Sequence, residues 1–155
     1  LFFCAGNLAE ELGIHRVDQL NGVGRRMPLT MVAFTIGAFG MIGLPPVAGF
    51  ISKWYLGIGA ATANDYFFVF VLMMSSLLNA AYFLPLVHAA WFKDPSPELL
   101  HVFEKRSNRR WEVSLLLLGP TLTTAAFSLL AGLFAASAYS PLGLAKMITR
   151  GWYLQ

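Results

Sequence analysis

Residues 43–54 read Gly43-Leu44-Pro45-Pro46-Val47-Ala48-Gly49-Phe50-Ile51-Ser52-Lys53-Trp54, and this stretch decides how the chain folds. Two consecutive prolines cannot continue a regular helix, because two amide donors are lost and Pro46 pushes Pro45 out of the helical region. Lys53 follows in the same stretch, and no other charged residue lies between Arg26 and Asp65. The sequence therefore predicts a break between apolar segments, with one isolated ammonium beside it.

The composition of the chain is that of a membrane protein. Hydrophobic residues make up 57% of it and charged residues 12%, whereas a soluble domain carries about 25% charged residues. Basic residues flank apolar runs, so the net charge of +3 indicates anchoring at a membrane surface rather than a nucleic-acid partner. We expect an all-α, polytopic transmembrane helical bundle in a lipid bilayer.

Four apolar runs predict the membrane spans, near residues 27–43, 46–63, 66–92 and 113–139. Polar loops join them at 10–26 and 93–112, and residues 1–9 have the character of a helix end whose start is missing. We interpret residues 1–155 as a C-terminal fragment of one transmembrane domain. Because one span needs about 20 residues, the run from 27 to 63 is expected to form two antiparallel spans, with one long interrupted helix as the alternative.

Lys53 is the candidate functional residue. Placing an ammonium at the bilayer centre costs about 2.5 to 3.5 kcal/mol even on lenient scales. Unwound backbone beside an ionisable residue is typical of an ion site, since irregular backbone is tolerated in a membrane only where it lines a cavity. We therefore favour a functional lysine over one that snorkels to the interface, with no continuous helix from 45 to 54. The supporting residues are Ser52, Pro45, Pro46 and Gly49.

The run from 66 to 92 carries the remaining candidate residues. Ser75, Asn79 and Tyr82 fall on one helical face, which we expect to contact protein rather than lipid. Helix packing is the favoured role for Asn79. His88, close to Trp91, is equally a proton relay or an interfacial residue.

Conventional enzyme chemistry has no support in the sequence. One cysteine excludes an internal disulfide, and three scattered histidines suggest no metal site and no redox cofactor. Phosphate-binding and hydrolase motifs are absent from the sequence. The chemistry that remains is proton or cation movement, in which burial disfavours the charged form of a lysine and a neighbouring charge can reverse that balance.

Three stretches carry a family resemblance: Gly24-Arg25-Arg26-Met27-Pro28-Leu29-Thr30, the run from Gly43 to Trp54, and Asn79-Ala80-Ala81-Tyr82-Phe83-Leu84-Pro85. Together they resemble the proton-conducting subunits shared by Mrp-type cation/proton antiporters and respiratory complex I, with the D-type subunits of Mrp antiporters as the nearest match. The resemblance implies a fourteen-helix antiporter-like fold with one broken helix. It also implies that Lys53 lies in the proton path, whose other residues would precede Leu1.

That resemblance implies a proton-translocating subunit of a multisubunit monovalent cation (sodium)/proton antiporter. The expected subunit is not itself an enzyme, crosses the inner (plasma) membrane several times, needs no cofactor and has other membrane subunits as partners. One alternative is an antiporter-like, proton-pumping subunit of a redox-driven complex, such as an NADH-quinone oxidoreductase or a membrane-bound hydrogenase. The other is a structural membrane subunit whose lysine pairs with a carboxylate and moves nothing.

Charge alone leaves the orientation undecided. If four spans alternate, Lys93, Lys105, Arg106, Arg109 and Arg110 face one side, and the other side holds the same number, namely Arg16, Arg25, Arg26, Lys146 and Arg150. The pair Arg109-Arg110 lies closest to a span, so we place the loop 93–112 in the cytoplasm.

Overall fold

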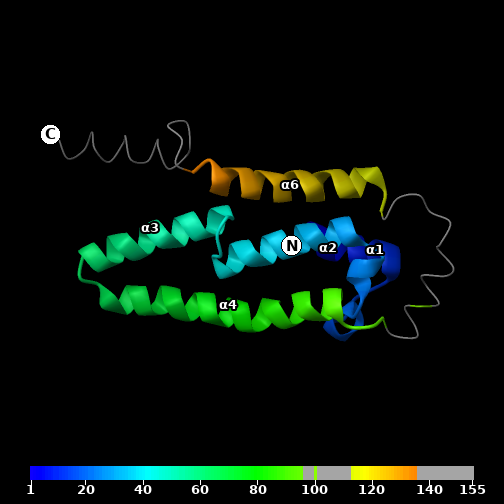
Figure 1. Cartoon of the computed structure of the whole chain (residues 1–155), viewed down its shortest axis with the longest axis horizontal. Coiled ribbons are helices and arrows are strands. Elements are labelled where there is room, and N and C mark those ends of the chain that lie inside the picture. The colour runs from blue at the N-terminus through cyan, green and yellow to red at the C-terminus, as the bar shows by residue number, and fades with distance from the viewer. Residues whose placement is uncertain (96–99, 101–112, 136–155) are drawn as a thin grey trace.

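The computed structural model describes residues 1–95, 100 and 113–135, and within these residues every regular element is a helix (Figure 1). The end of the predicted span 113–139, most of the loop 93–112 and the segment after 135 lie outside the described residues. The elements in chain order are α1 (Phe2–Leu12), η1 (Val17–Leu20), η2 (Val23–Arg25), α2 (Pro28–Ile42), α3 (Ala48–Thr62), α4 (Tyr66–Phe92) and α6 (Leu115–Leu133).

Helix α1 runs further than the sequence indicated and ends in a glycine cap. Gly13 has a left-handed backbone (φ 65°), its amide donates to the Ala9 carbonyl at 3.0 Å, and the amide of Ile14 donates to the Leu8 carbonyl at 3.3 Å. This pattern satisfies carbonyls that the helix end leaves unpaired. It also turns the chain so that Ile14 enters the core.

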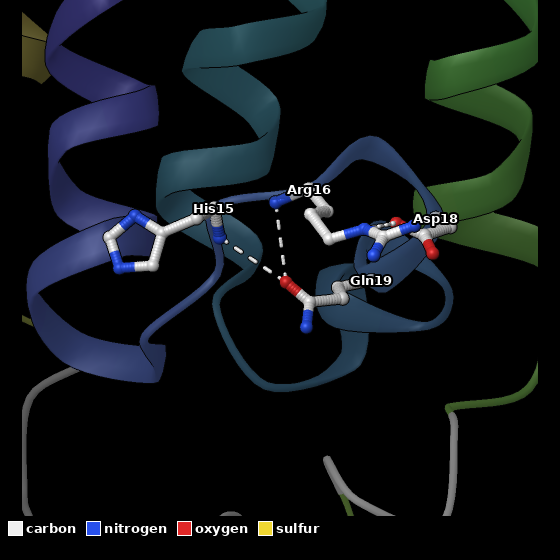
Figure 2. A network of polar contacts seen from close by, with 4 residues as sticks. All are labelled: His15, Arg16, Asp18 and Gln19. Atoms are coloured by element: carbon white, nitrogen blue, oxygen red, sulfur yellow. Dashed lines mark hydrogen bonds and ion pairs between the residues drawn. The ribbon is translucent and has the colours of Figure 1, made fainter.

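The polar connector after α1 is a packed loop that contains the short helices η1 and η2. Of its apolar residues, Ile14 and Leu20 are buried, while Val17 is 53% exposed. Figure 2 shows how the loop is held: the side-chain oxygen of Gln19 accepts from the amides of His15 and Arg16, each at 3.2 Å. The imidazole of His15 takes no part in these bonds.

Helices α2 and α3 do not form the antiparallel pair that we predicted. Figure 1 shows them following one another in the same direction, with α3 displaced sideways, while α4 runs back along both. Each has 15 residues, or about 22 Å at 1.5 Å per residue, too short for a hydrocarbon core of about 30 Å. Only together are they long enough to cross it, and their common direction favours the alternative of one interrupted helix.

Contacts along α4 confirm this direction. The indole of Trp91 donates to the Thr35 hydroxyl of α2 at 3.1 Å, and Phe83 packs edge-to-face on Phe34, with ring centroids 6.4 Å apart. Further back along α4, Ser76 contacts Lys53 of α3. A single continuous helix, begun by the Asp65 side chain accepting from the Phe68 amide at 3.2 Å, therefore spans both halves of the broken one.

Residues 45–54 do not form one continuous helix, as predicted, and the break is confined to the start of this segment. Helix α2 ends at Ile42 and α3 begins at Ala48, so residues 43–47 are non-helical, but residues 48–54 form a regular helix. Gly43, with φ 87°, turns the chain out of α2. The prolines then precede the first turn of α3 instead of interrupting its interior, and a helix tolerates proline there.

The buried core lies at one end of the bundle. Among the described residues, twelve buried ones form it; they come from α1, the connector, α2 with the residue before it, the end of α4, and Val113 just before α6. Helix α3 has no buried residue. Tyr66–Phe92 and Leu116–Leu133 are long and apolar enough to cross a membrane, and Pro28–Ile42 is a shorter apolar helix. Large apolar side chains on α3 and α4 are exposed, as expected for surfaces that face lipid or other subunits.

The connector and the segment after α4 meet at this same end. The guanidinium of Arg25 lies 3.2 Å from the carboxylate of Asp94, and the amide of Gly22 donates to the Ala89 carbonyl at 3.1 Å. The predicted loops 10–26 and 93–112, which two antiparallel spans would place on opposite sides, therefore begin on one side.

Candidate functional site

Lys53 holds the break together through three hydrogen bonds. Its Nζ atom donates to the carbonyl oxygens of Met41 at 2.8 Å and Ile42 at 3.1 Å, and to the hydroxyl of Ser76 at 2.9 Å. The three N–H groups of an ammonium thus each have an acceptor. The side chain joins the end of α2, the second turn of α3 and the middle of α4.

The two carbonyls are available because a helix ends there. The last four carbonyls of an α-helix have no intrahelical partner, and the helix dipole makes that end negative. A cation near a helix C-terminus is stabilised by both effects. The break therefore creates a site for a positive charge, and Lys53, which lies five residues into the second half, fills it.

Gly43 makes room for the lysine stem. A Cβ atom at Gly43 would lie 2.8 Å from Cδ of Lys53, closer than two carbon atoms can approach without strain. Gly43 and Lys53 both line an open groove of about 840 Å³ between α3 and α4. Its other walls are largely apolar and include Phe50, Trp54 and Phe70.

Two further glycines let other backbones approach the break. A Cβ atom on Gly49 of α3 would collide with the carbonyl oxygen of Gly40 of α2, and one on Gly132 of α6 would collide with the carbonyl oxygen of Pro46. Backbone therefore packs on backbone around the break, as small residues allow in membrane helices. The close approach of α2 to α3 is a physical reason for the predicted supporting role of Gly49. The sequence did not indicate a role for Gly132.

The polar stripe that the sequence indicates on α4 does not supply a partner of Lys53. Ser75 is exposed, and Tyr82 is 58% exposed. The side chain of Asn79 donates to the Ser75 carbonyl of its own helix at 2.8 Å. Ser76 makes the contact instead, because a shift of one residue rotates a side chain by about 100° around a helix. Both side chains are exposed in this chain taken alone, so the statement that this stripe faces protein stays a prediction.

The remaining predicted residues lie apart from the lysine. The exposed Ser52 donates to the Ala48 carbonyl at 3.5 Å. His88 is exposed and stacks on Phe92, with ring centroids 5.2 Å apart. It lies twelve residues beyond Ser76 on α4, or about 18 Å along the helix axis. The described structure thus brings together Lys53, the break and Ser76, and leaves His88 near the C-terminal end of α4.

A second buried polar contact was missed by the sequence reasoning. Asn7 of α1 donates to the hydroxyl of Thr121 of α6 at 3.0 Å, and Thr121 in turn donates to the Leu117 carbonyl at 2.8 Å. Both side chains are almost fully buried. In the sequence, Thr121, Thr124 and Ser128 recur at helical spacing, which identifies a polar face of the helix but not its partner.

The comparisons with known proteins agree on one family. The sequence model described as "NADH:quinone oxidoreductase/Mrp antiporter, TM" matches residues 1–79, just over half of the chain. No solved structure matches the chain.

Several curated proteins are similar to part of the chain. NADH-quinone oxidoreductase subunit N of Desulforudis audaxviator is 49% identical over 98 residues, which are 63% of this chain and 20% of that protein. The subunit N of Hirschia baltica is 33% identical over 87 residues, or 56% of this chain and 18% of that protein. NAD(P)H-quinone oxidoreductase chain 4 3 of Trichormus variabilis is 32% identical over 105 residues, which are 64% of this chain and 20% of that protein. The matched region spans about one fifth of each relative.

Proposed function

The chain belongs to the transmembrane family shared by NADH:quinone oxidoreductases and Mrp antiporters, and on this premise we propose that it is part of an antiporter-like, proton-translocating subunit of an NADH-quinone oxidoreductase. The sequence alone favoured a sodium/proton antiporter, with the redox complex as the alternative. The names of the relatives support the alternative, because those quoted above are subunits or chains of quinone oxidoreductases.

The observation that carries the proposal is the position of Lys53. One ionisable side chain lies where a broken helix exposes free carbonyls, and it bridges three helices that contribute little other polarity. An ionisable residue inside a membrane segment is by default a functional candidate. In this proposal Lys53 takes a proton from groups elsewhere in the subunit and releases it towards one face of the membrane.

The fold and partners follow as parts of the same proposal. The chain supplies the last helices of a fourteen-helix bundle, with α2 and α3 as the two halves of its broken helix. The subunit carries no redox chemistry of its own and works with other membrane subunits in the plasma membrane, where electron transfer elsewhere in the complex drives the proton step.

The main rival is structural. The three hydrogen bonds that hold the ammonium for proton transfer also cap α2 and tie it to α4, and a lysine with that role alone would move no proton. Such a residue would affect assembly first, because α2 would lose the partner of its terminal carbonyls.

The test uses the full-length protein in its complex, in inverted membrane vesicles. NADH-driven proton uptake is compared with sodium-driven proton movement in the absence of NADH, and assembly is followed on native gels of the same membranes. We expect Lys53→Ala to abolish NADH-driven uptake in an assembled complex, and the exposed Lys93→Ala to leave it unchanged. Full uptake by assembled Lys53→Ala would overturn the role of Lys53 in the proton path. Lost assembly would favour the structural role. Sodium-driven proton movement without NADH would favour the sodium/proton antiporter over the redox complex.

A further inference from the structure

The three acceptors around Lys53 are not equivalent. Two are main-chain carbonyls, of Met41 and Ile42, which can only accept hydrogen bonds. The third is the hydroxyl of Ser76, which accepts from Nζ at 2.9 Å and can also donate. This difference decides what happens around the nitrogen when a proton leaves.

A neutral amine has two N–H donors and one lone pair. The carbonyls of Met41 and Ile42 can keep the two donors, since each already accepts one. The lone pair then faces the position of Ser76, and of the three partners only the serine hydroxyl can donate to it. Ser76 therefore satisfies both protonation states of Lys53 without any movement of α3 or α4.

We propose that Ser76 is the proton-exchange partner of Lys53, an inference that rests on the proton-translocating function proposed above. In the release step the N–H bond that faces Ser76 breaks, and its proton forms a new O–H bond with the serine oxygen. The original O–H bond of Ser76 breaks in the same step, and that proton passes to a water molecule. Lysine ends neutral, serine ends neutral with its new O–H donating to the lysine nitrogen, and the water carries the positive charge.

The surroundings of Ser76 set it apart from other hydroxyls. Thr35, Thr121 and Thr124 each donate to a carbonyl of their own helix, which is the usual arrangement in a helix. Ser76 is half-buried and accepts from a charged group of another helix. Among the described residues that line the groove between α3 and α4, Lys53 and Ser76 are the side chains with an ammonium or a hydroxyl group.

The experiment separates the hydroxyl from the shape of the side chain. Threonine and valine have nearly the same shape, and only threonine carries the hydroxyl, so Ser76→Thr and Ser76→Val form a matched pair. Both are measured in the full-length protein within its complex, by NADH-driven proton uptake in inverted vesicles, with assembly checked on native gels. Ser76→Ala provides a smaller variant without a hydroxyl if valine disturbs packing. Ser75→Ala, one residue away and exposed, is the control.

We expect Ser76→Val and Ser76→Ala to lower proton uptake about tenfold in assembled complexes, the effect of one lost hydrogen bond in the rate-limiting transfer. Ser76→Thr should retain most of the activity, and Ser75→Ala all of it. Equal uptake by assembled Ser76→Thr and Ser76→Val, whether high or low, would overturn the assignment to the hydroxyl. If Lys53→Ala is inactive while Ser76→Ala is fully active, this inference fails alone. If Lys53→Ala is fully active, the proposed function fails with it.

Discussion

Gly43 and Lys53 lie against one another: a Cβ atom at residue 43 would lie 2.8 Å from Cδ of the lysine. The glycine also has φ 87°, which side-chain-bearing residues rarely adopt. One residue thus ends α2 and leaves the space through which the lysine stem reaches the free carbonyls. The position of the ammonium depends on the absence of a methyl group ten residues earlier in the chain.

Replacing Gly43 should therefore displace the side chain of Lys53 while leaving the lysine itself unchanged. Gly43→Ala adds about 1–3 kcal/mol of backbone strain and pushes the lysine stem away from α2. We expect reduced NADH-driven proton uptake in inverted vesicles, with some complex still assembled. Gly59→Ala in α3 is the control, since a Cβ atom there meets nothing within 4 Å. Normal uptake by Gly43→Ala would mean that the lysine does not need its observed position.

Lys53→Arg distinguishes a proton carrier from a helix cap. A guanidinium keeps its positive charge and donates hydrogen bonds to the carbonyls of Met41 and Ile42, but it does not lose its proton in proteins. We expect normal assembly on native gels and loss of NADH-driven proton uptake. Lys93→Arg, at the exposed end of α4, should behave as the wild type. An active, assembled Lys53→Arg would support a purely structural lysine.

Gly132 should be needed for α6 to pack on the break. In Gly132→Ala the new methyl group meets the carbonyl oxygen of Pro46 and lies 2.7 Å from the Val47 carbonyl carbon, so one of the two backbones must move. Overpacking of this kind costs about 1–3 kcal/mol. We expect a lower thermal unfolding temperature of the detergent-solubilised complex. Gly119→Ala, on the same helix with open space around it, should leave this temperature unchanged.

The contact between Asn7 and Thr121 should stabilise the packing of α1 on α6. Thr121→Val keeps the shape of the side chain but removes the acceptor of the buried Asn7 amide. Leaving a buried donor unsatisfied costs about 1–3 kcal/mol, so the thermal unfolding temperature should fall. Thr121→Ser keeps the hydroxyl and should lose less stability. Equal losses in both variants would show that the missing methyl group or repacking, rather than the hydrogen bond, controls stability.

The local features of the fold could be predicted from the sequence. Hydropathy located the helices, because a membrane segment must be both apolar and long enough, and α4 has the bounds that its apolar run indicated. The prolines at 45 and 46 located the break, because proline acts on the residues next to it. An isolated lysine in apolar surroundings was visible from charge alone.

The features that depend on residues distant in sequence could not be predicted. The direction of α3 depends on the approach of Gly49 to Gly40 and on α4 packing along both halves, which no local pattern encodes. Ser76 was passed over for Ser75 because the two differ only in their rotation about the helix axis. Asn7 and Thr121 are 114 positions apart, and hydropathy cannot pair them.

Treating α2 and α3 as the two halves of one crossing has a consequence for how the chain is oriented on insertion into a membrane. The connector and the start of the segment after α4 meet at one end of the bundle, and α6 begins there too (Figure 1). Among the described residues, Arg16, Arg25, Arg26 and Lys93 then belong to this one end, and Lys53 lies at the break. By the positive-inside rule we expect this end to stay in the cytoplasm, whereas alternating spans would divide the same four charges between the two sides.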